Sequence, residues 1–179
     1  MGPERLVVLE YHTKDQWAFR ETEALYSSYD VEGTPSVFFD GKNGVAGGSD
    51  ASYLYARYKR ITEKELTARE LLTLSAARAS DIIPGIINVK LTNISEETFT
   101  DLQLIGVAYQ DFGTERHHFL VSDISAVNVP EIRPGDSLEL EISFETQASL
   151  LNTVLFVKSV TGQIIQGTRL AGTSQIWLP

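Results

Sequence analysis

The chain has 179 residues, of which 24 are acidic and 15 basic, and its formal net charge is −9. A hydrophobic content of 42% is enough to build a core and excludes a wholly disordered chain, while the acidic balance argues against nucleic-acid binding, which depends on lysine and arginine. The absence of cysteine excludes disulfides and thiol chemistry within this chain, and no apolar run approaches the roughly 20 residues of a membrane-spanning helix.

Residue usage changes along the chain and predicts two parts. Residues 1–66 hold 10 of the 17 aromatic residues and six of the seven tyrosines. Residues 67–179 consist of short β-branched runs separated by Gly, Pro, Asn and Asp. We therefore expect one domain over residues 1–66 and a second over residues 67–179. Because no Gly/Ser-rich linker separates them, we expect the two to pack directly together.

Apolar runs and turn residues in the first part predict a strand, a helix, a hairpin and a second helix. The run Leu6–His12 is typical of a strand buried on both faces, and Glu21–Tyr29 is typical of a helix with glutamates in its first turn. Ser36–Phe39 predicts a strand, which an Asp-Gly turn joins to a short strand over Val45–Gly47. The second helix begins at Asp50. Its amphipathic stripe consists of Tyr53, Leu54, Arg57, Tyr58 and Ile61.

This order of elements, together with the segment Tyr29–Gly41, resembles the C-terminal half of a thioredoxin-like domain. The segment reads Tyr-Asp-Val-Glu-Gly-Thr-Pro-Ser-Val-Phe-Phe-Asp-Gly, with Ser36 where the family usually has threonine. The resemblance implies a cis bond between Thr34 and Pro35, and X-Pro is the one peptide bond for which cis costs little. Only 34 residues precede Pro35. We therefore expect the strand and helix that carry the family's Cys-x-x-Cys pair to be missing from this chain.

The longer stretch Leu9–Tyr58 is similar to bacterial outer-membrane or lipoprotein-like thioredoxin-fold proteins. The matching features are Leu-Glu-Tyr-His, the Gly-Thr-Pro segment, the following Asp-Gly and Gly-Gly pairs, and Tyr-x-x-Tyr. Those proteins pair a thioredoxin-like domain with a C-terminal immunoglobulin-like sandwich. The resemblance implies a cell-envelope or exported location. Residues 1–5 nevertheless lack the charged and apolar regions of a signal peptide, so the compartment stays open.

About seven short strands predict an antiparallel β-sandwich for the second part. The clearest strand covers Leu138–Phe144, where apolar residues alternate with acidic ones. The turn Arg133–Asp136 resembles a turn of bacterial immunoglobulin-like modules, and the hairpin over Val154–Gln166 resembles the last hairpin of the lipoprotein-like family. The remaining candidate strands are Leu71–Ala79, Ile86–Thr92, Leu102–Tyr109, Arg116–Val121, Asn152–Val160 and Gln163–Thr168.

The expected fold class is therefore α+β in two parts: a partial thioredoxin-like α/β unit that lacks the redox strand and helix, then an antiparallel immunoglobulin-like β-sandwich. In the complete thioredoxin fold, the missing strand lies between the strands that match Leu6–His12 and Ser36–Phe39. Unpaired backbone groups at such a gap cost about 1–3 kcal/mol each. The first strand could shift to pair directly, the segment could be loosely ordered, or two chains could exchange strands. We favour a homodimer that forms through the incomplete sheet or by strand exchange.

Two groups of residues are candidate sites. Thr34 and Pro35 form the cis-proline candidate. Five tyrosines could form either an aromatic ligand patch or an interface, and we favour packing or an interface because tyrosine suits half-buried positions. These five are Tyr26, Tyr29, Tyr53, Tyr55 and Tyr58.

No pattern in the chain predicts a catalytic, metal or cofactor site. His117 and His118 lie near three acidic residues in the sequence, but adjacent histidines on a strand point to opposite faces and do not easily share one ion. Neither a nucleophile elbow, a P-loop nor a Rossmann glycine pattern is present. Asn93–Ser95 is a formal glycosylation sequon.

Two functions follow from these expectations. The first is a non-catalytic binding or structural module of a bacterial protein, which acts through a protein partner and without a cofactor. The alternative is a fragment of a thiol–disulfide oxidoreductase whose Cys-x-x-Cys lies upstream of Met1, with Pro35 beside the missing cysteines. In neither case do we expect enzymatic activity of this chain, nucleic-acid binding or a membrane span.

Overall fold

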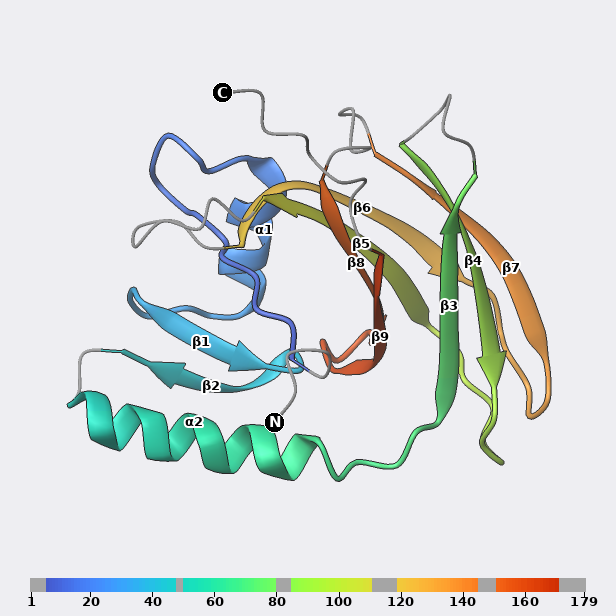
Figure 1. The fold of residues 1–179 in the computed structure, drawn as a ribbon, viewed down its shortest axis with the longest axis horizontal. Helices are drawn as coiled ribbons and strands as arrows, with labels where there is room; N and C mark the ends of the chain where they lie inside the picture. The colour runs from blue at the N-terminus through green and yellow to red at the C-terminus, as the bar shows by residue number, and fades with distance from the viewer. Residues whose placement is uncertain (1–5, 48–49, 80–84, 111–118, 145–150, 171–179) are drawn as a thin grey trace, which may run out of the picture.

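A computed structural model describes residues 6–47, 50–79, 85–110, 119–144 and 151–170. Across these ranges the chain forms two helices and nine strands (Figure 1). The helices are α1 (Arg20–Ser28) and α2 (Ala51–Glu65). The strands are β1 (Ser36–Phe39), β2 (Lys42–Ala46), β3 (Leu72–Arg78), β4 (Ile86–Asn93), β5 (Leu102–Gln110), β6 (Leu120–Val129), β7 (Ser137–Ser143), β8 (Asn152–Ser159) and β9 (Ile164–Leu170).

The seven strands from β3 to β9 form an antiparallel β-sandwich. One sheet has the order β3-β4-β7 and the other has the order β6-β5-β8-β9. Contacts between β3 and β9 and between β6 and β7 join the two sheets along their edges. This strand order is consistent with an immunoglobulin-like sandwich.

The core of the sandwich lies between the facing sides of the two sheets. Ile87, Val89 and Leu91 alternate along β4 and are almost fully buried, as the two-residue period of a strand with one buried face requires. Leu104 of β5 and Leu155 of β8 belong to the same apolar cluster and come from the opposite sheet. Removal of these side chains from water is what holds the two sheets together.

The four-stranded sheet is also buried on its second face. Leu9, Tyr11 and Phe19, which precede the first helix, pack there against apolar side chains of the sheet. One consequence is that β8 is buried at five successive positions, Thr153–Val157, because both of its faces are covered. Burial in this layer also raises the pKa of the Tyr11 phenol. The sheet contributes Val107, Tyr109, Val121, Val154 and Phe156 to this second cluster.

The predicted first strand, Leu6–His12, takes a different position from the one expected. It pairs with β6 instead of β1, and only through an isolated parallel bridge between Glu10 and Leu120. The Glu10 N–H donates to the carbonyl of Phe119 at 3.0 Å, and the carbonyl of Glu10 accepts from the N–H of Val121 at 3.1 Å. Leu9 and Tyr11 of this run pack on the outer face of the four-stranded sheet, whereas Leu6, Val7 and Val8 are exposed. The run is therefore not the strand buried on both faces that the sequence predicted. The structure gives no support to the homodimer that the supposed gap suggested.

The expected α+β fold class is wrong, because the chain is a β-rich protein. Within the described part of the chain, every strand of the three sheets pairs antiparallel, and β1 and β2 form a separate two-stranded sheet with no central strand beside them. The Gly-Thr-Pro segment and the Asp-Gly turn are local features that specify a bend and a hairpin in any fold. A thioredoxin-like unit additionally needs long-range pairing to a central strand, and these short segments do not encode it.

The remaining differences concern the ends of elements. The strand predicted over Arg116–Val121 overlaps β6 only at Leu120 and Val121, because β6 begins at Leu120 and continues to Val129. Residues 116–118 lie outside the described residues. Helix α2 ends at its C-cap, Leu66, and residues 67–71 lead into β3. The division into domains at this point stays a prediction. Among the described residues, no helix has the length and apolar character needed to cross a membrane.

Candidate functional site

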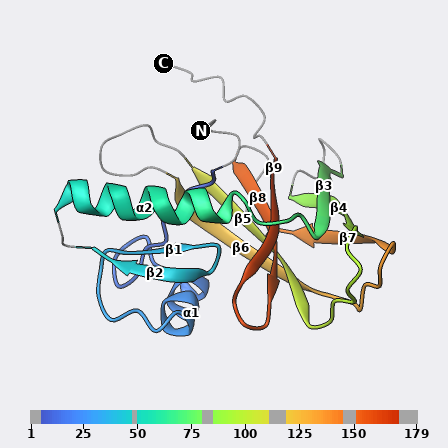
Figure 2. The same ribbon diagram turned by 90° about the horizontal axis from the view of Figure 1, so that it is seen from below.

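The β1–β2 hairpin lies between the two helices and carries an aromatic residue toward each of them. Phe38 stacks on Tyr29, just after α1, with ring centroids 4.5 Å apart, and Phe39 meets Tyr58 of α2 at 5.4 Å. Because successive strand residues point to opposite faces, α1 and α2 cover opposite faces of the hairpin, as Figures 1 and 2 show.

A close backbone approach anchors the hairpin to the sandwich. The carbonyl of Asp40 accepts a hydrogen bond from the N–H of Ile164 at 2.9 Å, which joins the β1–β2 turn to the start of β9. Gly41 has a φ of +72°, and a Cβ at this position would lie 1.9 Å from the carbonyl oxygen of Gly162. Only glycine fits this contact without movement of the backbone.

Helix α2 runs antiparallel to β2 and is held at both ends. At its N-terminus, the Asp50 carboxylate accepts hydrogen bonds from the N–H groups of Ser52 at 2.9 Å and Tyr53 at 3.1 Å. At its C-terminus, Glu65 Oε2 lies 3.4 Å from Lys42 Nζ at the beginning of β2. The Asp50 cap stabilises the first turn of the helix, and the Glu65–Lys42 pair places its last turn beside β2, even though none of the helix residues is fully buried.

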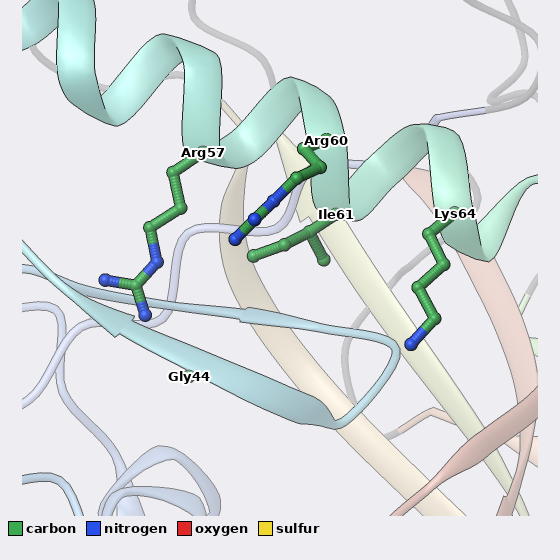
Figure 3. A pocket seen from close by; sticks show the side chains of 5 residues that line it. All are labelled: Gly44, Arg57, Arg60, Ile61 and Lys64. Carbon is green, nitrogen blue, oxygen red and sulfur yellow. The ribbon is translucent and has the colours of Figure 1, made fainter.

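A groove of about 490 Å³ lies between α2 and β2. Its helical wall carries three cationic side chains, which extend from α2 toward the hairpin in Figure 3. Their spacing of three and four residues places them on one face of the helix, and they span about 10 Å along its axis. A Cβ on Gly44 of β2 would lie 2.8 Å from the ring of Phe38, so a side chain there needs the ring to move. The residues that line this α2 groove are Gly44, Arg57, Arg60, Ile61 and Lys64.

The three cations of the α2 groove have no anionic partner in the described part of the chain. The neighbouring carboxylates are engaged elsewhere: Glu65 pairs with Lys42 at 3.4 Å, and Glu63 faces Lys59 at 3.9 Å. Three like charges therefore line one groove of a protein whose net charge is −9. A bound anion would relieve their mutual repulsion, and the arginines can hold a carboxylate or phosphate through paired hydrogen bonds.

The chemistry of the α2 groove is that of binding. Its lining consists of cations, one aliphatic side chain and a glycine, so these residues include no nucleophile and no general base. No group of three or more His, Asp or Glu among the described residues is arranged to hold a metal ion. His117 and His118 lie outside the described residues.

Two of the five candidate tyrosines lie on the α1 side of the hairpin. Tyr29 is half-buried under Phe38, its pKa is raised by burial, and Lys158 Nζ lies 5.6 Å from its ring centroid. Lys14 Nζ lies 4.7 Å from the ring centroid of Tyr26. Both rings thus meet a lysine in cation–π geometry, which links α1 to its surroundings.

The other three candidate tyrosines lie on α2 and differ in exposure. Tyr58 packs against Phe39, on the opposite face of the hairpin from Tyr29. Tyr53 and Tyr55 are 58% and 69% exposed, so Tyr53 does not take part in the buried stripe expected of it. The structure therefore distributes the five tyrosines over two faces of the hairpin and the outer surface of α2.

The bond between Thr34 and Pro35 is cis, the geometry that the sequence predicts. Pro35 begins the turn into β1, and its carbonyl accepts a hydrogen bond from the N–H of Gly47 at 2.7 Å. A Cβ on Gly47 would lie 2.6 Å from Pro35 Cγ, so the hairpin closes tightly here. A binding role for this pair stays a prediction.

Three titratable residues of the N-terminal segment form a cluster that was not predicted from the sequence. His12 Nδ1 lies 2.6 Å from Asp15 Oδ2, and His12 Nε2 lies 3.1 Å from Glu10 Oε1. Partial burial alone would lower the pKa of His12, but the hydrogen bonds to the two carboxylates outweigh it and raise that pKa above its usual value. The spacing of Glu10 and His12, two residues apart in an extended segment, is the signal that could have revealed the pair.

Comparison with known proteins yields no family and no curated relative, since no family model and no curated protein matches the chain. The solved structures that the chain resembles include three with low TM-scores. The archaellum periplasmic stator protein FlaG from Sulfolobus acidocaldarius has a TM-score of 0.37 and 14% identity over 56% of this chain and 100% of its own. A β-D-glucoside glucohydrolase from Trichoderma reesei has a TM-score of 0.30 and 12% identity, over 75% of this chain and 25% of that one. The GH3 β-glucosidase of Bifidobacterium adolescentis has a TM-score of 0.31 and 12% identity, over 60% and 18%. Similarity at this level carries no argument about function.

Proposed function

We propose that the chain is a non-catalytic binding module that binds acidic ligands in the α2 groove. One observation carries the proposal: Arg57, Arg60 and Lys64 line a single groove without an anionic partner among the described residues, in a protein of net charge −9. Unpaired cations at one place on an acidic protein are what an electrostatic binding site for an anion requires.

The binding should be weak and sensitive to salt. Arg60 and Lys64 are exposed and Arg57 is half-buried, and an exposed ion pair contributes only about 0.2–1 kcal/mol. A ligand must therefore contact several of the cations at once to bind measurably. Because the Debye length is about 8 Å at physiological ionic strength, added salt should weaken these contacts.

The thiol–disulfide oxidoreductase alternative is not retained. It depends on a thioredoxin-like unit, and among the described residues β1 and β2 form a two-stranded sheet with no central strand beside them. We keep the protein partner of the first hypothesis and assign it to the α2 groove.

A calorimetric titration with a hexaglutamate peptide at low and at physiological salt tests the proposal. The double variant Arg57→Gln/Arg60→Gln should bind roughly 2- to 30-fold more weakly than the unchanged protein, as the loss of two exposed ion pairs predicts. The matched control Lys59→Gln/Arg133→Gln removes the same charge outside the groove and should change binding less than twofold. Equal losses in the two variants, or no binding to the unchanged protein, would contradict the proposal.

A further inference from the structure

The α2 groove adjoins an open edge of a β-sheet. In the described part of the chain β2 pairs only with β1. Gly47 bonds to Pro35 on the β1 side, and because strand backbone groups alternate in direction, those of the preceding residue, Ala46, face away from β1. The pairing shifts register between Val37 and Phe39, next to Gly44, so this alternation applies only to Ala46. An unpaired edge of this kind is a template for another strand.

The cations of α2 lie beside this open edge. Helix α2 follows β2 in the antiparallel direction, with Gly44 opposite the row of Arg57, Arg60 and Lys64 (Figure 3). An added strand would lie about 4.8 Å from β2 and would place alternate side chains about 6.7 Å apart on the side of α2. The cations span about 10 Å along the helix, so two acidic residues separated by one residue lie within reach of the row.

We infer that the α2 groove takes an extended acidic segment of a partner protein, which adds to β2 as a third strand. This inference rests on the proposed function and specifies the ligand and how it binds. The open edge offers both N–H donors and carbonyl acceptors. A peptide backbone can bond to both kinds of group, whereas a polyphosphate can only accept hydrogen bonds and therefore leaves the carbonyl groups of the edge without partners. Nucleic acid is disfavoured by the net charge of −9. Half-buried Ile61 gives the alkyl parts of the segment an apolar contact.

Backbone-methylated peptides test the mode of binding without any change to the protein. The probe is a capped peptide of alternating glutamate and valine, six residues long. One derivative carries N-methyl groups on the odd amides and the other on the even amides, so both keep every charge. In an added strand only one of these sets faces β2. One derivative should therefore bind at least tenfold more weakly than the parent peptide, while the other stays within about threefold of it. The parent peptide should also slow amide hydrogen exchange at Ala46.

The outcomes separate this inference from the proposed function. If both derivatives bind as well as the parent peptide, and Arg57→Gln/Arg60→Gln still weakens binding, the groove binds acidic ligands but strand addition is wrong. If tripolyphosphate binds as tightly as the parent peptide and leaves the Ala46 amide unprotected, the groove is a phosphate site and the inference falls. If neither probe binds, both the inference and the proposed function fail.

Discussion

Asn93 at the end of β4 joins two connections of the sandwich through its side chain. It is 1% exposed. Its Nδ2 donates to the carbonyls of Glu97 at 2.7 Å and Ile132 at 3.1 Å, and its Oδ1 accepts from the Ser95 N–H at 3.0 Å and from Ser95 Oγ at 2.8 Å. All the hydrogen-bonding groups of this amide are engaged with the protein. Although Asn93 begins a formal glycosylation sequon, its Nδ2 is buried and engaged in the folded state.

The substitution Asn93→Ala should therefore destabilise the protein strongly. It removes four hydrogen bonds, each worth about 0.5–1.5 kcal/mol net, and takes the partner from the N–H of buried Ser95, at a cost of about 1–3 kcal/mol. Since these contributions are not additive and some groups will recruit water, we expect a loss of about 3 kcal/mol in the free energy of unfolding. For a protein of this size that corresponds to a fall of about 6–12 °C in the thermal midpoint.

Thermal unfolding followed by circular dichroism measures this effect. The matched control is Asn128→Ala, which makes the same change at an exposed position of β6 and should shift the midpoint by no more than about 2 °C, as surface substitutions do. A second variant, Asn93→Asp, keeps Oδ1 but turns a carboxylate toward two carbonyl oxygens, so its midpoint should improve as the pH falls and the carboxylate takes up a proton. Equal midpoints for Asn93→Ala and Asn128→Ala would refute the role assigned to Asn93.

Two further predictions concern the N-terminal segment and the hairpin turn. The pKa of His12 is raised in the folded state above its ordinary value of 6.5, so its stabilising effect is complete below that value and is lost as the pH rises through the folded pKa. His12→Asn should accordingly lower the thermal midpoint at about pH 5 and have little effect at about pH 9; an effect that grows with pH would contradict this. Gly41→Ala should destabilise the protein more than Gly135→Ala in urea unfolding, because both glycines have positive φ but only Gly41 brings a new Cβ within 1.9 Å of the Gly162 carbonyl oxygen. Equal losses in the two variants would show that the turn moves away from β9.

Elements whose formation depends on near neighbours could be predicted from the sequence. The alternation of apolar and acidic residues along β7, the Asp-Gly turn after β1 and the amphipathic pattern of α2 all lead to the observed elements. The same reasoning placed strands at β3, β4, β5, β8 and β9 within one or two residues of their bounds. These features rest on side-chain period and turn chemistry, which act over a few residues.

The patterns in the sequence did not predict the α2 groove, and of its three cations only Arg57 was assigned to the amphipathic stripe of the helix. The spacing of Arg57, Arg60 and Lys64 places the three cations on one helical face from the sequence alone. The tertiary structure adds two facts, because it places α2 along β2. The three cations have no anionic partner in the described structure, and Gly44 lies opposite them. Their role as a site therefore depends on a pairing of segments separated in the sequence.

The position of the N-terminal run shows most clearly where local reasoning ends. An apolar run such as Leu6–His12 signals burial, but hydrophobic burial has no direction and does not name the surface that receives it. The outer face of the four-stranded sheet offered that surface, and Leu9 and Tyr11 pack there instead of beside β1. Hydrophobic period and turn chemistry thus specified the individual strands and helices. Only the competition among apolar surfaces in the folded chain decided that they assemble as a β-rich protein with an open edge at β2.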